Sequence, residues 1–192
     1  HGTSRRQRQM CIRDSNDVVF DLSSIAKGFA VDKVLTYLKK NDFSNLLIDI
    51  GGEIAVIGFK NDDSWTVGIT NPNKQLSNDQ FVIRNREGEF LGIATSGDYL
   101  NFNYQNGVKK THTIDPRLGD SKQNNIISVS VISLDSTELA DAYATTLNAM
   151  DLNEAIRFAE TNNIACLIIY KDLINDSSEV YFSTDWHNLQ NV

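Results

Sequence analysis

Short β-patterned segments fill the middle of this chain, and helical patterns lie on either side of them. The predicted helices run from the capping residues 21–24 to about Asn41, from the capping pair 135–136 through Leu147, and over 152–161. The strands are expected at 45–50, 53–59, 65–69, 80–84, 92–94, 99–104, 110–114, 125–133, 164–170 and 179–183. Helices outside a run of strands favour an α+β domain over a doubly wound parallel sheet.

The composition is that of an ordinary globular domain and excludes several classes of protein. Hydrophobic residues make up 41% and charged residues 22% of the 192 residues, which is close to the average for folded domains. No stretch approaches the roughly 20 apolar residues that a membrane-spanning helix needs. The net charge of −7 argues against nucleic acid as a ligand. Cys11 and Cys166 form no CxxC pair, so neither a disulfide framework nor a zinc site is indicated.

Residues 1–15 differ from the rest of the chain. They contain four arginines and one aspartate, so they carry +3 and leave −10 on residues 16–192. A basic arm that binds nucleic acid or anionic lipid is one interpretation of this charge run. We favour the other, in which 1–15 is a non-native segment and 16–192 carries the fold.

The segment Asp21–Gly28 combines two residues that are unfavourable at a helix start. Lys27 faces the positive end of the helix dipole, and Gly28 costs about 1 kcal/mol relative to Ala inside a helix. Together they suggest a site where Lys27 meets an anion and Gly28 allows close approach of a backbone or ligand. A solvated lysine in a frayed first turn is the equally good alternative.

Gly51-Gly52 separates two apolar strand patterns, 45–50 and 53–59. Such a pair marks either a β-bulge or a place where a ligand approaches the backbone. The structural bulge is the preferred interpretation, within a bent pair of strands.

His112 lies just before a turn formed by Asp115-Pro116 and Gly119. A catalytic or phosphate-contacting histidine is one hypothesis for this loop and for the neighbouring segment 94–99. A surface turn with an incidental histidine is favoured when the loop is considered alone.

Asp141 and Thr145 are four residues apart on a predicted helix, so they share one face. A carboxylate and a hydroxyl placed in this way can both reach one hard cation, and oxygen-only ligands favour Mg²⁺ over Zn²⁺. The alternative is a capping aspartate and a threonine bonded back to its own helix.

Taken in order, DLSSIAKGFAVD, LIDIGGEIAVIG, ATSGDY, THTIDPRLG and ELADAYATTLNAM resemble the ApbE family of FAD:protein FMN transferases. The resemblance extends from about Val18 to Val192. It implies a mixed, mainly antiparallel sheet flanked by helices, of the ApbE or T-fold type. It also implies an enzyme that uses FAD and Mg²⁺, releases AMP and attaches FMN to a Thr or Ser hydroxyl of an acceptor protein.

The resemblance also assigns roles to individual residues. Asp21, Lys27 and His112 match positions that contact FAD, and His112 and Asp141 are the expected catalytic residues. The expected metal ligands are the Ser24 carbonyl, where Ala is usual, and the Asp141 and Thr145 side chains. Glu138 stands where a further acid is sometimes found, and Asp115 and Arg117 belong to the His112 loop.

The chemistry of these residue types fits phosphoryl transfer, which needs positioning and charge neutralisation more than covalent help. Mg²⁺ and Lys27 would stabilise the phosphate charge, and His112 or a nearby carboxylate would serve as the base. Two alternatives stay open: an FAD pyrophosphatase that gives FMN and AMP, and a flavin-binding protein without turnover.

The remaining expectations come from the resemblance alone. Family members carry a substantial portion before the DLSSIAKG motif, so this chain is expected to be the C-terminal part of such a domain. The acceptor is expected to be a subunit of a membrane respiratory electron-transfer complex. The intact protein is expected on the periplasmic side of the bacterial inner membrane with a lipid anchor, and a homo-oligomer is left open.

Overall fold

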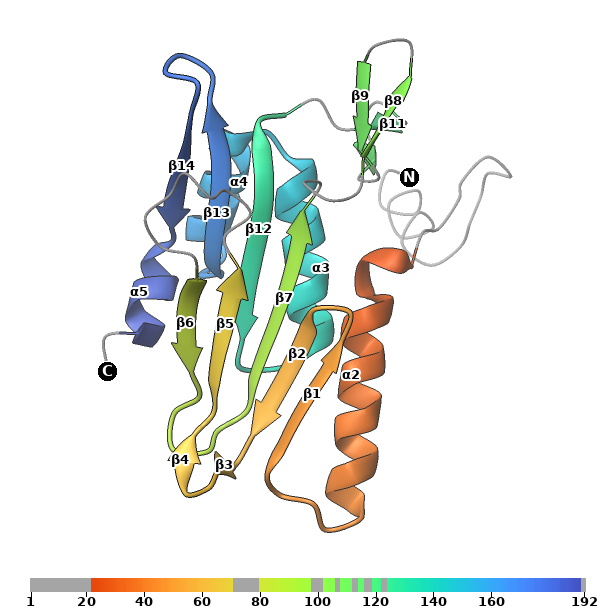
Figure 1. Cartoon of the computed structure of the whole chain (residues 1–192), viewed down its shortest axis with the longest axis vertical. Coiled ribbons are helices and arrows are strands. Elements are labelled where there is room, and N and C mark those ends of the chain that lie inside the picture. Colours follow the sequence, from red (N-terminus) through yellow and green to blue (C-terminus); the bar gives the residue numbers. More distant parts are fainter. Residues whose placement is uncertain are drawn as a thin grey trace, which may run out of the picture.

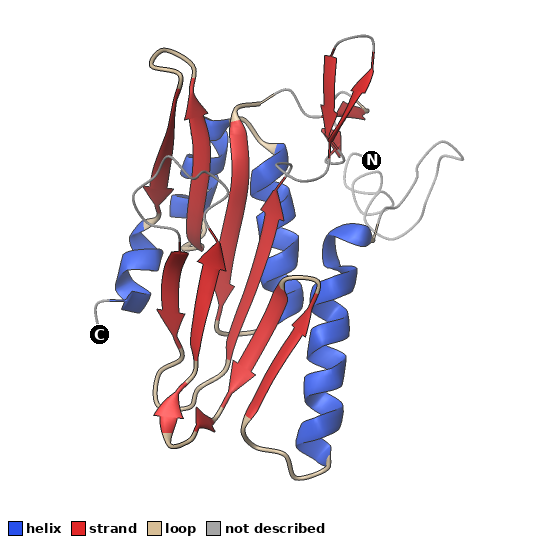
Figure 2. Ribbon diagram, viewed as in Figure 1, coloured by secondary structure: helices blue, strands red, loops and turns tan. Residues whose placement is uncertain are grey.

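The computed structural model describes residues 22–70, 80–97, 102–105, 108–111, 114–115, 119–121 and 124–190. Its main body is a six-stranded sheet in the order β1-β2-β7-β12-β13-β14, with antiparallel pairing between all neighbours (Figure 1). These strands are β1 (Leu46–Ile50), β2 (Glu53–Ile57), β7 (Leu91–Gly97), β12 (Ile126–Ser133), β13 (Ala165–Asp172) and β14 (Ser177–Phe182). The predicted α+β fold with a mainly antiparallel sheet and flanking helices is confirmed (Figure 2).

Helices cover one face of this sheet, and a hairpin with a short helix covers the other (Figure 1). The first layer consists of α2 (Ser23–Lys40), α3 (Thr137–Ala149) and α4 (Leu152–Thr161). The second consists of β5 (Thr66–Thr70), β6 (Gln80–Arg84) and α5 (Thr184–Gln190). Because the sheet is covered on both faces, the central strand β12, which forms where a strand was expected at 125–133, is buried along most of its length.

Apolar side chains fill the space on both sides of the sheet. Ala140, Ala144 and Leu147 of α3 pack in one cluster with Val129 and Val131 of β12. A second cluster on the opposite face joins β5 and β6 to the sheet and contains the buried Trp186 of α5. A third lies between α2 and the β1–β2 hairpin. The sheet therefore provides a rigid platform on which α2 and α3 lie side by side.

The remaining described strands form short two-stranded pairs. They are β3 (Phe59–Lys60) with β4 (Asp63–Ser64), β8 (Phe102–Gln105) with β9 (Val108–Thr111), and β10 (Ile114–Asp115) with β11 (Asp120–Ser121). Of the helices in the described part of the chain, none is long and apolar enough to cross a membrane.

Gly51-Gly52 is a tight hairpin turn, so the expectation of a β-bulge was wrong. Ile50 pairs directly with Glu53 across the turn, and both glycines have positive φ, +64° and +97°. Two-residue hairpin turns require this left-handed backbone, which glycine adopts without strain. The Asp49 carboxylate accepts the Gly52 N–H at 2.9 Å and closes the turn.

The start of one helix and the existence of another also differ from expectation. The α2 helix already begins at Ser23, inside the predicted capping segment 21–24, and its N-cap residue Leu22 makes no side-chain capping bond. The α5 helix was not predicted, because seven residues are too few to show a helical period. Its Trp186 is nevertheless 2% exposed and anchors the C-terminal region to the sheet.

Candidate functional site

Helices α2 and α3 approach each other closely at Gly28. A Cβ atom added there would lie 2.5 Å from the Thr137 carbonyl oxygen and 2.7 Å from Glu138 Cα. Real side chains do not make such contacts, so only glycine allows the two backbones to lie at this distance. The prediction that Gly28 permits close approach is confirmed for a backbone.

The start of α3 is capped twice, once from its own chain segment and once from α2. Ser136 Oγ accepts the Leu139 N–H at 3.1 Å, as the capping prediction required. Asp32 of α2 accepts the Thr137 N–H at 3.0 Å and the Glu138 N–H at 2.8 Å through its two carboxylate oxygens. A carboxylate at a helix N-terminus is favoured by the dipole and by the unpaired N–H groups there. Asp32 thus fixes the relative position of α2 and α3, a role that the sequence did not suggest.

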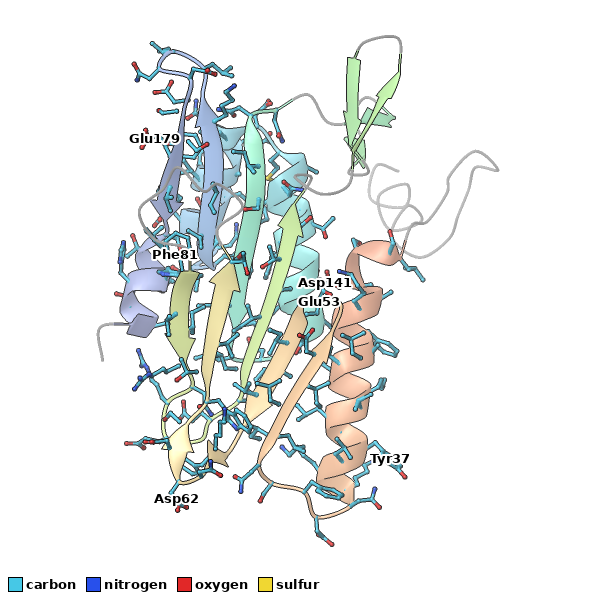
Figure 3. The ribbon with its side chains drawn as sticks, viewed as in Figure 1. Tyr37, Glu53, Asp62, Phe81, Asp141 and Glu179 are labelled. Atoms are coloured by element: carbon cyan, nitrogen blue, oxygen red, sulfur yellow. The ribbon has the colours of Figure 1, made fainter. Side chains whose placement is uncertain are left out.

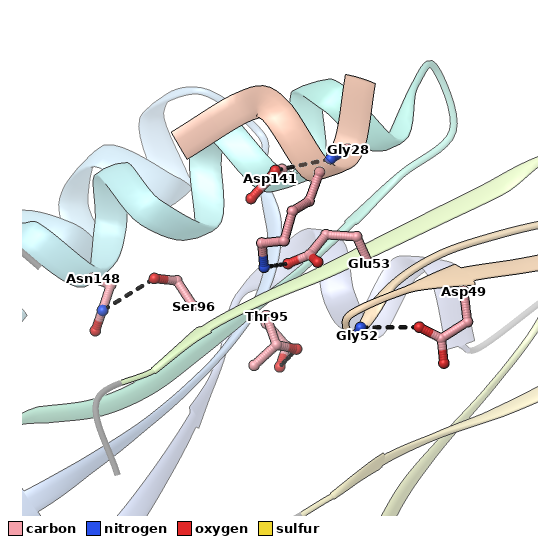
Figure 4. A network of polar contacts seen from close by, with 10 residues as sticks. Gly28, Asp49, Gly52, Glu53, Thr95, Ser96, Asp141 and Asn148 are labelled. Carbon is pink, nitrogen blue, oxygen red and sulfur yellow. Dashed lines mark hydrogen bonds and ion pairs between the residues drawn. The ribbon is translucent and has the colours of Figure 1, made fainter. Parts of the chain in front are cut away.

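Asp141 points from α3 back to α2 and is 4% exposed. Its Oδ2 atom accepts the Gly28 backbone N–H at 2.9 Å (Figure 4). It is therefore not a cap of its own helix, which was the structural alternative. The bond joins two motifs that are 113 residues apart in the sequence.

Lys27 forms an ion pair with Glu53, the residue that follows the glycine turn. Lys27 Nζ lies 2.5 Å from Glu53 Oε1. The lysine side chain is 49% exposed and the glutamate side chain 1% exposed, so about half of the lysine side chain faces solvent while the carboxylate is buried. The turn lies against this pair, because a Cβ atom on Gly51 would be 3.7 Å from Lys27 Cδ and 3.9 Å from Glu53 Oε2. Lys27 is therefore not a freely solvated residue in a frayed turn.

The two carboxylates of Glu53 and Asp141 lie next to each other between α2 and the sheet (Figure 3). Burial raises the pKa of Glu53, and the nearby Asp141 charge adds to that rise, while the bond to Lys27 opposes it. Burial likewise raises the pKa of Asp141, against the Gly28 N–H bond and the Lys27 charge. Two buried acids with raised pKa values next to a lysine are a candidate functional site on physical grounds.

The residues around Asp141 fit a hard divalent cation. Thr145 lies one turn further along α3 on the same face and is half-buried. Its neighbour Thr146 donates to the Ala142 carbonyl at 2.8 Å, whereas Thr145 makes no such bond back to its helix within the described part of the chain. The alternative of a back-bonded Thr145 is thus not supported.

Helix geometry leads us to expect the Ser24 carbonyl close to Asp141. In a regular helix it is the acceptor of the Gly28 N–H, the same N–H that donates to Asp141 Oδ2. Carbonyl, carboxylate and hydroxyl oxygens are the donors that Mg²⁺ prefers. No group of three or more His, Cys, Asp or Glu residues suited to a metal ion exists in the described ranges.

A polar strip continues along α3 from this group (Figure 4). Asn148 is fully buried and donates to Ser96 Oγ of β7 at 3.2 Å. Thr95 points to the opposite face of the sheet, where its hydroxyl lies 2.7 Å from Ser130 Oγ. Of the described residues 94–97, Ser96 therefore carries the hydroxyl on the α3 side.

The other predicted residues are placed as follows. Asp21, His112 and Arg117 lie outside the described residues, and for Asp115 only the backbone of β10 is described. The half-buried Glu138 contributes its N–H to the Asp32 cap. Glu53 was not predicted as a site residue. An acid directly after Gly51-Gly52, at the start of a strand that is otherwise apolar, was the signal that could have identified it.

Comparison with known proteins gives consistent results. The model of the ApbE family matches residues 2–168. The FAD:protein FMN transferase of Vibrio cholerae is 37% identical over 175 residues, which are 91% of this chain and 51% of the relative. That of Escherichia coli K12 is 29% identical over 94% of this chain and 50% of the relative.

Solved structures agree with the sequence comparison. The flavin transferase ApbE from Vibrio cholerae superimposes with a TM-score of 0.78 at 35% identity, over 92% of this chain and 54% of the other. The apo form of the Pseudomonas stutzeri flavinyl transferase ApbE gives a TM-score of 0.75 at 27% identity, over 90% of this chain and 52% of the other. The chain thus spans about half the length of the relatives it matches.

Proposed function

The chain belongs to the ApbE family, and from this membership we propose that it is part of an FAD:protein FMN transferase. In the proposed reaction a Thr or Ser hydroxyl of an acceptor protein attacks the FMN phosphorus of FAD. The new phosphoester bond forms as the pyrophosphate P–O bond to AMP breaks, and AMP leaves. The hydroxyl proton passes to His112 or to a nearby carboxylate.

Three residues of the described site would hold the cation in this proposal. They are Asp141 and Thr145 through their side chains and Ser24 through its carbonyl. When bound, Mg²⁺ would neutralise charge on the phosphate oxygens of FAD. The Lys27 ammonium would bind a phosphate oxygen at the same place, and Asp21 and His112 would contribute further contacts to FAD.

The observation that carries the proposal is the hydrogen bond between Gly28 and Asp141. This bond places Lys27, whose positive charge suits an anionic substrate, near Asp141, whose carboxylate suits a cation. Phosphoryl transfer requires both charges at one place, because the phosphate must be positioned and neutralised together. The relatives, which are named FAD:protein FMN transferases, support the identity of the flavin.

The acceptor and the location are also parts of this proposal. The acceptor would be a subunit of a membrane respiratory electron-transfer complex. The intact protein would lie on the periplasmic side of the inner membrane with a lipid anchor. Both are supported by the family resemblance alone.

The test is incubation of the purified chain with FAD and Mg²⁺, with and without an acceptor domain. Released AMP and the flavin fluorescence that stays on the denatured acceptor are both measured. Labelling that requires Mg²⁺ and is lost in Asp141→Ala supports the transferase, and Asp135→Asn, on an exposed residue next to α3, is the matched control.

Other outcomes identify the alternatives. AMP and free FMN without labelling would identify a pyrophosphatase, and bound but intact FAD would identify a binding protein. Because the chain spans half of its relatives, an inactive result is followed by the same assay on the chain extended with the N-terminal half of the Vibrio cholerae relative.

A further inference from the structure

Glu53 is buried more completely than its role as a partner of Lys27 requires. Its side chain is 1% exposed, and the lysine occupies only the Oε1 atom. The second oxygen, Oε2, is buried and has no hydrogen-bond partner among the described residues. In a surface pair such as Lys171–Asp176, whose side chains are 49% and 85% exposed, the carboxylate is not buried.

An unpaired buried carboxylate oxygen is costly, since its hydration is lost and nothing replaces it. Native proteins rarely leave such an atom without a water or an ion. Mg²⁺ keeps several of its water molecules in proteins, and a water of this kind is a donor of the type that Oε2 lacks. The unpaired atom therefore points to a hydrated cation close by.

The charges of the site lead to the same conclusion. Lys27 contributes one positive charge, and Glu53 and Asp141 contribute one negative charge each, so the ionised group carries a net −1. Without Glu53 the remaining pair would be neutral, and the lysine would be free to pair with Asp141. In the described part of the chain Lys27 makes its ion pair with Glu53 and not with Asp141.

We infer that Glu53 is a second acidic group of the cation site, acting from outside the set of direct ligands. It keeps the Lys27 ammonium off Asp141 and leaves the site with a net negative charge, which favours a divalent cation. This inference rests on the proposed function, because it assumes that the cation binds at Asp141. It makes Glu53 a positioning residue rather than a catalytic one.

The experiment measures divalent-cation binding without FAD, so it does not depend on activity. Mg²⁺ is titrated calorimetrically into the full chain, and Mn²⁺ binding is followed by electron paramagnetic resonance. The variants are Glu53→Gln, Lys27→Met, the double variant and Asp141→Asn. Asp49→Asn is the matched control, because it removes an exposed carboxylate from the same hairpin and keeps an acceptor for Gly52.

We expect Glu53→Gln to weaken binding of both cations by roughly 10- to 100-fold, the range for groups that support metal ligands from outside. Asp49→Asn should change it by less than about threefold, because exposed charges are screened. Adding Lys27→Met to Glu53→Gln should restore much of the lost cation affinity, because the double variant no longer carries a lysine ammonium without its Glu53 partner. A merely structural Glu53 would not show this rescue.

Two results would overturn the inference in different ways. Wild-type affinity in Glu53→Gln, with binding abolished in Asp141→Asn, would refute the role of Glu53 and leave the proposed function intact. Wild-type affinity in Asp141→Asn would refute the cation site itself. If Glu53→Gln does not fold, as judged by circular dichroism, Glu53→Asp is used. Its shorter side chain keeps the charge but cannot hold the Lys27 ammonium in the same place, so adding Lys27→Met to Glu53→Asp should tighten cation binding. No tightening would overturn the inference.

Discussion

The Gly28 N–H and the Asp141 carboxylate are joined by a 2.9 Å hydrogen bond that connects the first turns of α2 to the second turn of α3. Because Lys27 immediately precedes Gly28, the same bond fixes the starting point of the lysine side chain relative to the acid. The geometry of the candidate site thus depends on how closely the two helices pack.

Gly28→Ala should destabilise the protein and disturb the site together. The added methyl would lie 2.5 Å from the Thr137 carbonyl oxygen, so the helices must separate. Overpacking of this kind costs about 1–3 kcal/mol. Urea unfolding measures the loss, and Ala26→Ser, on the exposed side of the same helix, should stay within about 0.5 kcal/mol of wild type. Equal stability of Gly28→Ala and wild type would contradict the close approach.

Asp141→Asn should remove the stabilisation that divalent cations give to the wild-type chain. A ligand at 100 times its dissociation constant stabilises the native state by about 2.7 kcal/mol. Thermal melts with Mg²⁺ and with EDTA should therefore differ for wild type and for Asp135→Asn, and coincide for Asp141→Asn. A cation-dependent shift that survives in Asp141→Asn would place the cation elsewhere.

Glu53 should make stability depend on pH in the direction opposite to most carboxylates. Its pKa is raised above the ordinary value of 4.5. At pH values between 4.5 and the raised pKa, the native state therefore binds more protons than the unfolded state. The Glu53 contribution to unfolding free energy therefore falls as pH rises above about 4.5. The difference between wild type and Glu53→Gln, from urea unfolding at several pH values, should become less favourable to wild type along that range.

Glu160 provides the contrast for that measurement. The Tyr181 hydroxyl and the Thr184 N–H lower its pKa, so its stabilisation is present above 4.5 and is lost as pH falls through the lowered pKa. As pH falls below 4.5, the difference in unfolding free energy between wild type and Glu160→Gln should therefore become less favourable to wild type. This pH dependence is opposite in sign to that expected for Glu53. The same sign for both variants would show that burial does not dominate at Glu53.

Asp32→Ala should cost about 1–3 kcal/mol, because it leaves two N–H groups at the start of α3 without their acceptor. Ser136→Ala, which removes one capping bond, should cost about 1 kcal/mol. The matched control is Asp151→Ala, since Asp151 is the N-cap of α4 but makes no side-chain capping bond. If Asp151→Ala is as damaging as Asp32→Ala, the inter-helix cap is not the cause.

Cys166 should be inert to thiol reagents in the folded chain. It is fully buried, and burial raises its pKa to about 12, so little thiolate forms at pH 8. In a Cys11→Ser background, a chromogenic disulfide reagent should react only after denaturation. Rapid reaction without denaturant would mean that the chain does not form the β13 core on its own.

Local patterns were sufficient for most of the fold. The strand expected at 65–69 forms as β5, and the capping Ser136 and the span of α4 at 152–161 are present as predicted. Each depends on neighbours within a few residues, where propensity and periodicity act directly. The turn at Gly51-Gly52 was misjudged because a bulge and a hairpin place glycines at the same positions in a sequence. Which of the two forms depends on whether the flanking strands pair with each other.

Residue type and local spacing were enough to identify the residues that are chemically suited to a site: Lys27 and Gly28 at a helix start, and Asp141 and Thr145 on one helical face. How these residues meet follows from the packing of the layers. Gly28 and Asp141 are 113 positions apart, Lys27 and Glu53 are 26 apart, and Asp32 and Glu138 are 106 apart. No local pattern encodes such pairs, because they follow from how the sheet presents α2 to α3. Burial, which raises the pKa values of Glu53 and Asp141 and leaves one oxygen unpaired, exists only once those layers have packed.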